Sequence, residues 1–214
     1  MKRNSKLILS VLAMISALVL VHCTPKSEYQ LRVERELASG VRADSLFLGY
    51  HFGMSKKAFM DHSWELNKEG VISGYSTIGH TFTELAYPAL MEFFPEFRDD
   101  KMVRMPVKIE YRGWAPWNDH LAPEVLMTDL VKHYEETYGE QFHEIKNEEV
   151  VGTKEMGIGM GVEMGQEIGG EMGGVMGDVT YISIRGNRQI RIFKESVSKV
   201  MLEFTDLSAS SVDS

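Results

Sequence analysis

The chain has 214 residues, 43% of them hydrophobic and 25% charged, and its formal net charge is −8. This length and apolar content are sufficient to bury one or two hydrophobic cores, which excludes a fully disordered chain. The acidic balance argues against a nucleic-acid-binding protein, because such proteins need a basic surface. Cys23 is the one cysteine of the chain, so no disulfide can form within it.

Residues 1–22 have the pattern of a signal peptide, which takes no part in the fold. A basic start formed by Lys2, Arg3 and Lys6 precedes an apolar run over 7–21. That run is shorter than the roughly 20 apolar residues that span a bilayer comfortably. Without the three basic residues, the rest of the chain carries 20 Lys plus Arg against 31 Asp plus Glu, a balance of −11.

The segment ends in Leu20-Val21-His22-Cys23, and this ending resembles the signal of bacterial lipoproteins. In that family the cysteine is lipidated and becomes the mature N-terminus. His22 departs from the family, which prefers Gly, Ala or Ser at that place. The resemblance implies a protein of the bacterial cell envelope, anchored to the outer membrane through acyl chains on Cys23. An uncleaved anchor and ordinary secretion are the other two interpretations.

The rest of the chain is expected to begin with a tether and a lead-in helix over 23–43, with the helix ending at Gly40. An α+β body is expected over 44–207, in two halves of about 44–112 and 121–207. Each half starts with a helical pattern and continues with strand patterns.

The helix of the first half is predicted to start at Lys56 and to end at Gly70. Ser55 is the predicted N-cap, because its hydroxyl can accept a hydrogen bond from a free amide of the first turn. Spacings of three and four predict an apolar stripe that faces the core. This stripe consists of Phe59, Met60, Ser63, Trp64 and Leu66.

After this helix the hydrophobic period changes from 3.6 to 2, which indicates strands. Short strands are expected at 71–75 and 81–86, and a longer one at 89–97. The most regular alternation of apolar and polar residues runs over 103–111. Pro106 lies within it and cannot donate a ladder hydrogen bond, so we expect an edge strand or a bulge there.

The linker 112–120 joins the two halves and contains Arg112, Trp114 and Trp117. Trp and Arg are enriched among the residues that dominate protein interfaces, so these three residues are candidates for binding a partner protein. In that case the indoles should be partly exposed. The alternative is that the two indoles are buried and seal the seam between the halves.

The second half is predicted to start with a helix from Pro123 to Gly139, since proline suits a first helical turn and glycine a C-terminal cap. Its expected inner face consists of Leu126, Met127, Leu130, Val131, Tyr134 and Tyr138. Strands are expected at 142–151, 180–185, 189–194 and 199–205, with a turn at Gly186-Asn187. Residues 208–214 are expected to form a disordered tail.

This order predicts an α+β fold of two similar units, each with a helix packed on antiparallel strands. The run Phe52-Gly53-Met54-Ser55, its helix, the closing glycine and the strand meander resemble the small outer-membrane-assembly lipoproteins and the β-lactamase-inhibitor-like fold. They are also similar to uncharacterised bacterial lipoproteins of this size. The resemblance covers 44–112, and residues 122–205 match the same pattern more weakly. It implies binding to proteins or envelope components, or inhibition of enzymes, and no catalysis.

A low-complexity insertion at 152–177 repeats glycine every fourth residue from 157 onward. Its glycines and its glutamates at 163, 167 and 171 argue against a helix, because glycine is a poor helix former and like charges would share one face. A flexible loop and ordered hairpin arms are both compatible with this composition. A third interpretation is a copper site, since methionine thioethers suit Cu(I).

Catalytic and cofactor motifs are absent from the sequence. The seven histidines form no HExxH or paired metal-ligand spacing, and there is no nucleophile elbow, phosphate loop or dinucleotide fingerprint. No catalytic residue, metal ligand or cofactor site is therefore assigned. The sequence favours a membrane-anchored protein-binding or inhibitor-like module. The alternative is an envelope hydrolase whose carboxylates or histidines converge from distant parts of the chain.

Overall fold

The computed structural model describes three stretches of the chain: 26–74, 77–146 and 179–210. The signal segment 1–22, the lipidation candidate Cys23 and the repeat at 152–177 lie outside these residues. The chain divides into two compact units, 1–35 and 36–214.

Helix α2 (Glu28–Ala38) lies where a lead-in helix was expected, and none of its residues is buried. Ser27 and Gln30 cap its start reciprocally. The Ser27 hydroxyl accepts a hydrogen bond from the Gln30 amide at 3.2 Å, and the Gln30 side chain accepts one from the Ser27 amide at 3.0 Å. This local exchange of hydrogen bonds stabilises the first turn.

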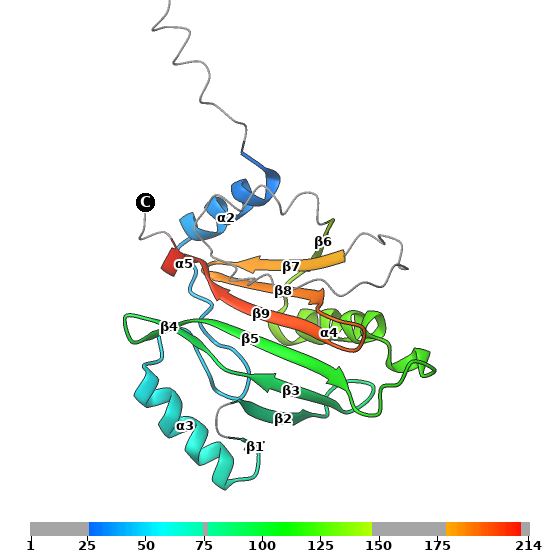
Figure 1. Cartoon of the computed structure of the whole chain (residues 1–214). Helices are drawn as coiled ribbons and strands as arrows, with labels where there is room; N and C mark the ends of the chain where they lie inside the picture. Colours follow the sequence, from blue (N-terminus) through cyan, green and yellow to red (C-terminus); the bar gives the residue numbers. More distant parts are fainter. Residues whose placement is uncertain (1–25, 75–76, 147–178, 211–214) are drawn as a thin grey trace, which may run out of the picture. The chain divides into compact units, whose positions relative to one another are not determined.

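A single antiparallel sheet forms the body of the second unit (Figure 1). Its described strands are β1 (Ile72–Ser73), β2 (Ile78–Phe82), β3 (Ala89–Phe93), β4 (Glu96–Arg98), β5 (Lys101–Tyr111), β6 (His143–Lys146), β7 (Val179–Arg185), β8 (Arg188–Lys194) and β9 (Val200–Asp206). The spatial order is β1-β2-β3-β5-β9-β8-β7-β6, and β4 pairs with β5 outside this path. The last strand of each predicted half, β5 and β9, therefore pair at the centre of the sheet. The α+β class is confirmed.

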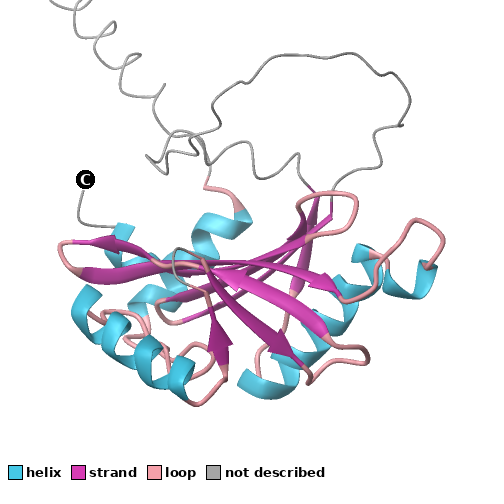
Figure 2. Ribbon diagram, turned by 60° about the horizontal axis from the view of Figure 1, so that its bottom comes forward, coloured by secondary structure: helices cyan, strands magenta, loops and turns pink. Residues whose placement is uncertain are grey.

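Helices α3 (Lys56–Lys68) and α4 (Pro123–Tyr138) lie on the same face of the sheet (Figure 2). Helix α4 ends as predicted, because Gly139 adopts the left-handed conformation with φ 65° that glycine tolerates best. A short 3-10 helix, η2 (Asp119–Leu121), precedes α4. Helix α5 (Leu207–Ser210) follows β9, where a disordered tail had been expected from residue 208.

The hydrophobic core lies between the sheet and these two helices. The alternation predicted for 103–111 is present in β5, where Met105, Val107 and Ile109 are fully buried. Their partners in β9 are Phe204, Leu202 and Val200, which are also fully buried. From the helix side the core receives Leu126, Met127, Leu130 and Tyr134 of α4, as predicted.

Of the two alternatives predicted for Pro106, the edge strand is wrong. A shift of register is present nearby, between Glu96 and Phe97 of β4, which pair with Arg104 and Met102 of β5. Strand β5 is central, with β9 on one side and both β3 and β4 on the other. Pairing with β4 ends at Arg104 and pairing with β3 begins at Val107. Pro106 thus lies where β5 passes from one neighbour to the next, so a residue without an amide hydrogen is tolerated there.

The strand expected at 89–97 is divided in two. Strand β3 ends at Phe93 and β4 begins at Glu96, so Phe94 and Pro95 form the connection between them. The expected strands at 71–75 and 81–86 are β1 and β2, and β2 starts three residues earlier than predicted. Short apolar runs do not specify strand boundaries, because pairing decides where a strand ends.

The predicted stripe of α3 is only half right. Ser55 caps the helix as expected, since its hydroxyl accepts a hydrogen bond from the Ala58 amide at 3.1 Å. Phe59 and Ser63 are buried, whereas Met60 is 54% and Trp64 is 61% exposed. Neighbouring helical residues differ by about 100° in direction, so a helix that packs by one face cannot bury both sets.

Candidate functional site

The linker between β5 and α4 is a compact turn with tryptophan at its tip. The Trp114 amide donates to the Tyr111 carbonyl at 3.2 Å, and the Asn118 amide donates to the Ala115 carbonyl at 2.8 Å. The Asn118 side chain also donates to the Gly113 carbonyl at 3.0 Å. These bonds connect residues within the loop, and Trp117 is 80% exposed.

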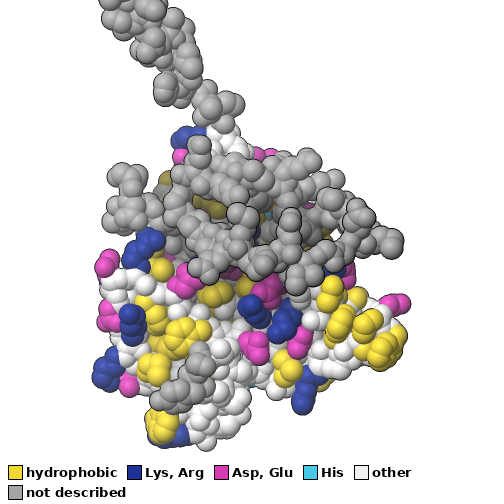
Figure 3. Space-filling model, viewed as in Figure 1, with side chains coloured by type: hydrophobic (Ala, Val, Ile, Leu, Met, Phe, Trp, Pro, Cys, Tyr) yellow, Lys and Arg dark blue, Asp and Glu magenta, His cyan; other side chains and the backbone are white. Residues whose placement is uncertain are grey.

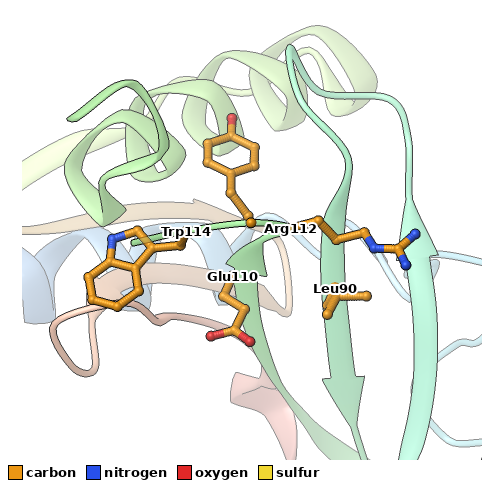
Figure 4. A pocket seen from close by; sticks show the side chains of 6 residues that line it. Leu90, Glu110, Arg112 and Trp114 are labelled. Atoms are coloured by element: carbon orange, nitrogen blue, oxygen red, sulfur yellow. The ribbon is translucent and has the colours of Figure 1, made fainter. Parts of the chain in front are cut away.

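A shallow cleft of about 270 Å³ lies beside this loop, on the face of the sheet opposite α3 and α4. Leu90 of β3, Glu110 of β5, Arg112 and Trp114 form its walls (Figure 4). Glu110 and Arg112 are two positions apart, so the strand geometry directs both side chains to this face. Tyr111 between them is buried, and its hydroxyl reaches Asp129 of α4 on the opposite face.

The cleft carries one charge of each sign. The Glu110 carboxylate accepts a hydrogen bond from the Ser198 hydroxyl at 3.3 Å, which brings the turn between β8 and β9 beside the cleft. Val197 in that turn is largely exposed. Arg112 lines the cleft, and among the described residues its guanidinium forms no ion pair or hydrogen bond.

Tyr111 fastens the end of β5 to α4 behind the cleft. Its hydroxyl donates a short hydrogen bond to the Asp129 carboxylate of α4, and its ring meets Tyr87 edge-on at 5.7 Å. Burial raises the pKa of the Tyr111 hydroxyl, and the bond to Asp129 raises it further, so the group stays protonated as a donor. The strand end that presents Glu110 and Arg112 is therefore rigid.

We call the set formed by Leu90, Glu110, Arg112, Trp114, Trp117 and Val197 the Trp117 surface. Figure 3 looks onto this face of the sheet and shows hydrophobic side chains gathered beyond the end of β5. The structure brings the predicted residues Arg112 and Trp114 together in one cleft, and Trp117 follows in the same loop. Trp114 is partly buried against the core, whereas Trp117 is exposed. Burial of both indoles as a seal between the halves is thus excluded.

Sequence reasoning did not find Leu90 and Glu110 as members of this surface. Both lie on the outward side of strands whose alternation is readable, and each pairs with the other across β3 and β5. The alternation shows only that they point away from the core. That they point toward the tryptophan loop depends on which strands are neighbours.

A second group of polar residues is buried around Arg188 of β8 and Ser183 of β7. The Arg188 guanidinium donates to the Glu140 carboxylate at 2.5 Å and to the Ser45 carbonyl at 2.5 Å, and it lies over the Tyr138 ring at 3.8 Å. The Ser183 hydroxyl donates to the other Glu140 oxygen at 2.9 Å. Both charged side chains are at most 5% exposed, so the pair is structural and closed to ligands.

The histidines and carboxylates needed by the hydrolase alternative are mostly dispersed. His133 of α4 lies 3.6 Å from Glu84, the one His–carboxylate contact among the described residues. His62 and His80 each face a backbone carbonyl, of Leu48 and of Val71. The described stretches contain no group of three His, Cys, Asp or Glu residues that could hold a metal ion.

Comparison with known proteins gives no match: neither a family profile, nor a curated protein, nor a solved structure corresponds to this chain. Over the described residues, none of the helices has the length and apolar character needed to cross a bilayer.

Proposed function

We propose that this chain is a lipid-anchored protein of the bacterial outer membrane, and that its body binds another envelope protein through the Trp117 surface. The observation that carries the proposal is Trp117, an indole that is 80% exposed at the tip of a well-ordered turn beside a cleft. Tryptophan is among the residues most enriched in interface hot spots.

The composition of the surface supports a protein partner. It combines two indoles and an arginine with leucine and valine, and charged and apolar groups alternate over a short distance. Interfaces favour aromatic residues and arginine in this way. Because the cleft is shallow and lined by few side chains, a side chain of a larger partner suits it better than a free small molecule.

The anchor is proposed from Cys23 and the residues before it. Acyl chains stabilise membrane attachment by roughly 0.8 kcal/mol per buried CH₂, and two or three chains anchor a protein stably. Metabolic labelling with palmitate tests this directly. Label should enter the wild type and not Cys23→Ser; equal labelling of both would contradict the anchor.

We also propose that the two helix-and-strand segments are copies of one unit. The strand order supports this, because α3 with β1, β2, β3 and β5 and α4 with β6, β7, β8 and β9 would be related by a twofold axis between β5 and β9. Such an axis joins the last strand of each unit in antiparallel fashion. Separate expression of 44–112 tests the proposal, since a duplicated unit should form a folded dimer with the same central pairing.

Photo-crosslinking in intact cell envelopes tests the partner proposal. A photoreactive amino acid at Trp117 should give a discrete adduct with one envelope protein, identified by mass spectrometry. The control position is Lys132, an exposed residue of α4 on the opposite face of the sheet. Arg112→Ala should weaken the adduct at Trp117. Equal adducts at both positions, or none at Trp117, would refute the docking surface.

A further inference from the structure

The outer face of α3 is a second exposed apolar feature, and the docking proposal does not use it. Met60 and Trp64 lie one helical turn apart and are 54% and 61% exposed. Phe94, in the connection between β3 and β4, is 45% exposed and meets Phe59 of α3 edge-on at 5.9 Å. We call Met60, Trp64 and Phe94 the Trp64 ridge.

Four charged residues beside the ridge form two ion pairs. Lys57 pairs with Asp61 at 2.6 Å, and Lys68 pairs with Glu65 at 2.9 Å. Lys68 also places its ammonium 5.7 Å from the Trp64 ring. The ridge therefore exposes an indole and a thioether, with two ion pairs beside them. Indoles with neighbouring lysines are characteristic of the water–membrane interface, where the ring lies among headgroups and the ammonium reaches water.

We propose that the Trp64 ridge lies in the headgroup region of the membrane to which the chain is anchored. This inference rests on the lipid anchor of the proposed function. Glu28, the first residue of α2, is five positions after Cys23, and α2 rises by 1.5 Å per residue. The first residue of the body, Glu36, is thus held within about 30 Å of the acylated cysteine.

This short connection makes a weak contact effective. A tethered surface meets its target at a high local concentration, so even a few side chains bind without a large intrinsic affinity. The ridge has three exposed apolar side chains, half as many residues as the Trp117 surface and far fewer than the roughly 20–30 that a standard protein interface uses on each side. These three side chains are sufficient for a contact with the membrane surface, because the lipid anchor already holds the protein at that membrane.

The contact depends on the indole and thioether and not on charge. The ridge and its rim carry paired charges, and the chain after the signal segment has an acidic balance. The acidic balance of the chain opposes attraction to anionic lipid, so we assign the contact to the apolar side chains. The contact should persist when salt is raised, because salt screens charge interactions and leaves apolar burial intact.

The three tryptophans of the chain allow a direct test. The full lipidated protein is placed in vesicles of phosphatidylethanolamine and phosphatidylglycerol that contain a brominated lipid, which quenches indoles in the membrane. One variant, Trp114→Phe with Trp117→Phe, retains Trp64. The matched control, Trp64→Phe with Trp114→Phe, retains Trp117.

Trp64 should lose at least roughly twice as much emission as Trp117, and the same ratio should be found in high salt. If the lipidated protein floats with the vesicles but the two indoles are quenched equally, the ridge inference is overturned and the anchor stands. If the protein carries no lipid and does not float, both proposals are overturned. Circular dichroism of both variants confirms that each is folded.

Discussion

Helices α3 and α4 lie on the same face of the sheet, yet they bury very different surfaces. Helix α4 packs on β5, β8 and β9 and places Leu126, Leu130 and Tyr134 in the core. Helix α3 packs beside β1 at one end of the sheet and buries Phe59 and Ser63 alone. A helix at the centre of a sheet has neighbours across a wide face, whereas a helix at its end keeps an open side.

This difference distinguishes the α4 side, which stabilises the fold, from the parts of the molecule that expose apolar side chains. The α4 side contains the buried ion pair and the hydrogen bond that fixes β5. The α3 side presents the Trp64 ridge, and the far end of β5 presents the Trp117 surface. Substitutions around α4 should therefore change stability, and substitutions on the two exposed surfaces should change binding.

The largest expected effect is at Arg188, which joins the end of α4 to β8. Arg188→Met leaves the Glu140 carboxylate buried without its cation and should lower the free energy of unfolding by about 3–5 kcal/mol. Urea unfolding measures this loss. The matched control is Lys57→Ala on α3, which breaks an exposed pair and should cost less than about 1 kcal/mol. Similar costs for both variants would contradict the assignment of α4 as the scaffold.

Leucine truncation compares the two helices directly. Leu126→Ala removes a fully buried side chain from α4 and should cost about 3 kcal/mol or more, because a cavity is left in a packed core. Leu66→Ala removes a partly buried side chain from α3 and should cost about half as much, since solvent can reach part of the site. Equal losses in urea unfolding would show that α3 is packed as tightly as α4.

Alkaline pH should weaken the attachment of α4. Burial raises the pKa of Tyr138 to about 12, despite the opposing effect of the Arg188 cation. The folded protein therefore keeps this proton between pH 10, where the unfolded tyrosine titrates, and about pH 12. Stability should fall as pH rises through this window, by at most about 1.4 kcal/mol per pH unit. Urea midpoints between pH 8 and pH 11 measure the slope, and Tyr138→Phe should reduce it; an unchanged slope would assign the loss to other groups.

The smallest expected effect on stability is at Trp64. Trp64→Ser should change the free energy of unfolding by less than about 0.5 kcal/mol, because the indole is mostly in solvent. A loss above about 2 kcal/mol would mean that the indole is a packed part of the fold and not a free ridge. Thermal unfolding of the two proteins is sufficient for this comparison.

Local features were predictable because their causes lie within a few residues. Ser55 caps α3 through an amide three residues away, and Gly139 ends α4 through its own backbone freedom. The alternation in β5 likewise follows from the pleat of one strand. The tryptophan loop could be proposed for the same reason, since Arg112, Trp114 and Trp117 are close in sequence.

Features that depend on distant neighbours could not be predicted. Arg188 and Glu140 are 48 positions apart, and nothing near either one shows that they form a buried pair. An edge strand or a bulge was expected at Pro106 because proline cannot donate a ladder hydrogen bond. Its position in β5, where pairing passes from β4 to β3, depends on the whole strand order. Leu90 joins the cleft for the same reason.

By itself, the sequence determined the α+β class, the helix caps, the alternating core of β5 and the turn that carries Trp117. The tertiary structure alone decided that β5 and β9 meet at the centre, that Arg188 pairs with Glu140, and that Met60 and Trp64 face solvent. Periodicity defines the apolar side of an element, but its neighbours decide how much of that side is buried. That is why the same helical pattern produced a core helix in α4 and a presenting helix in α3.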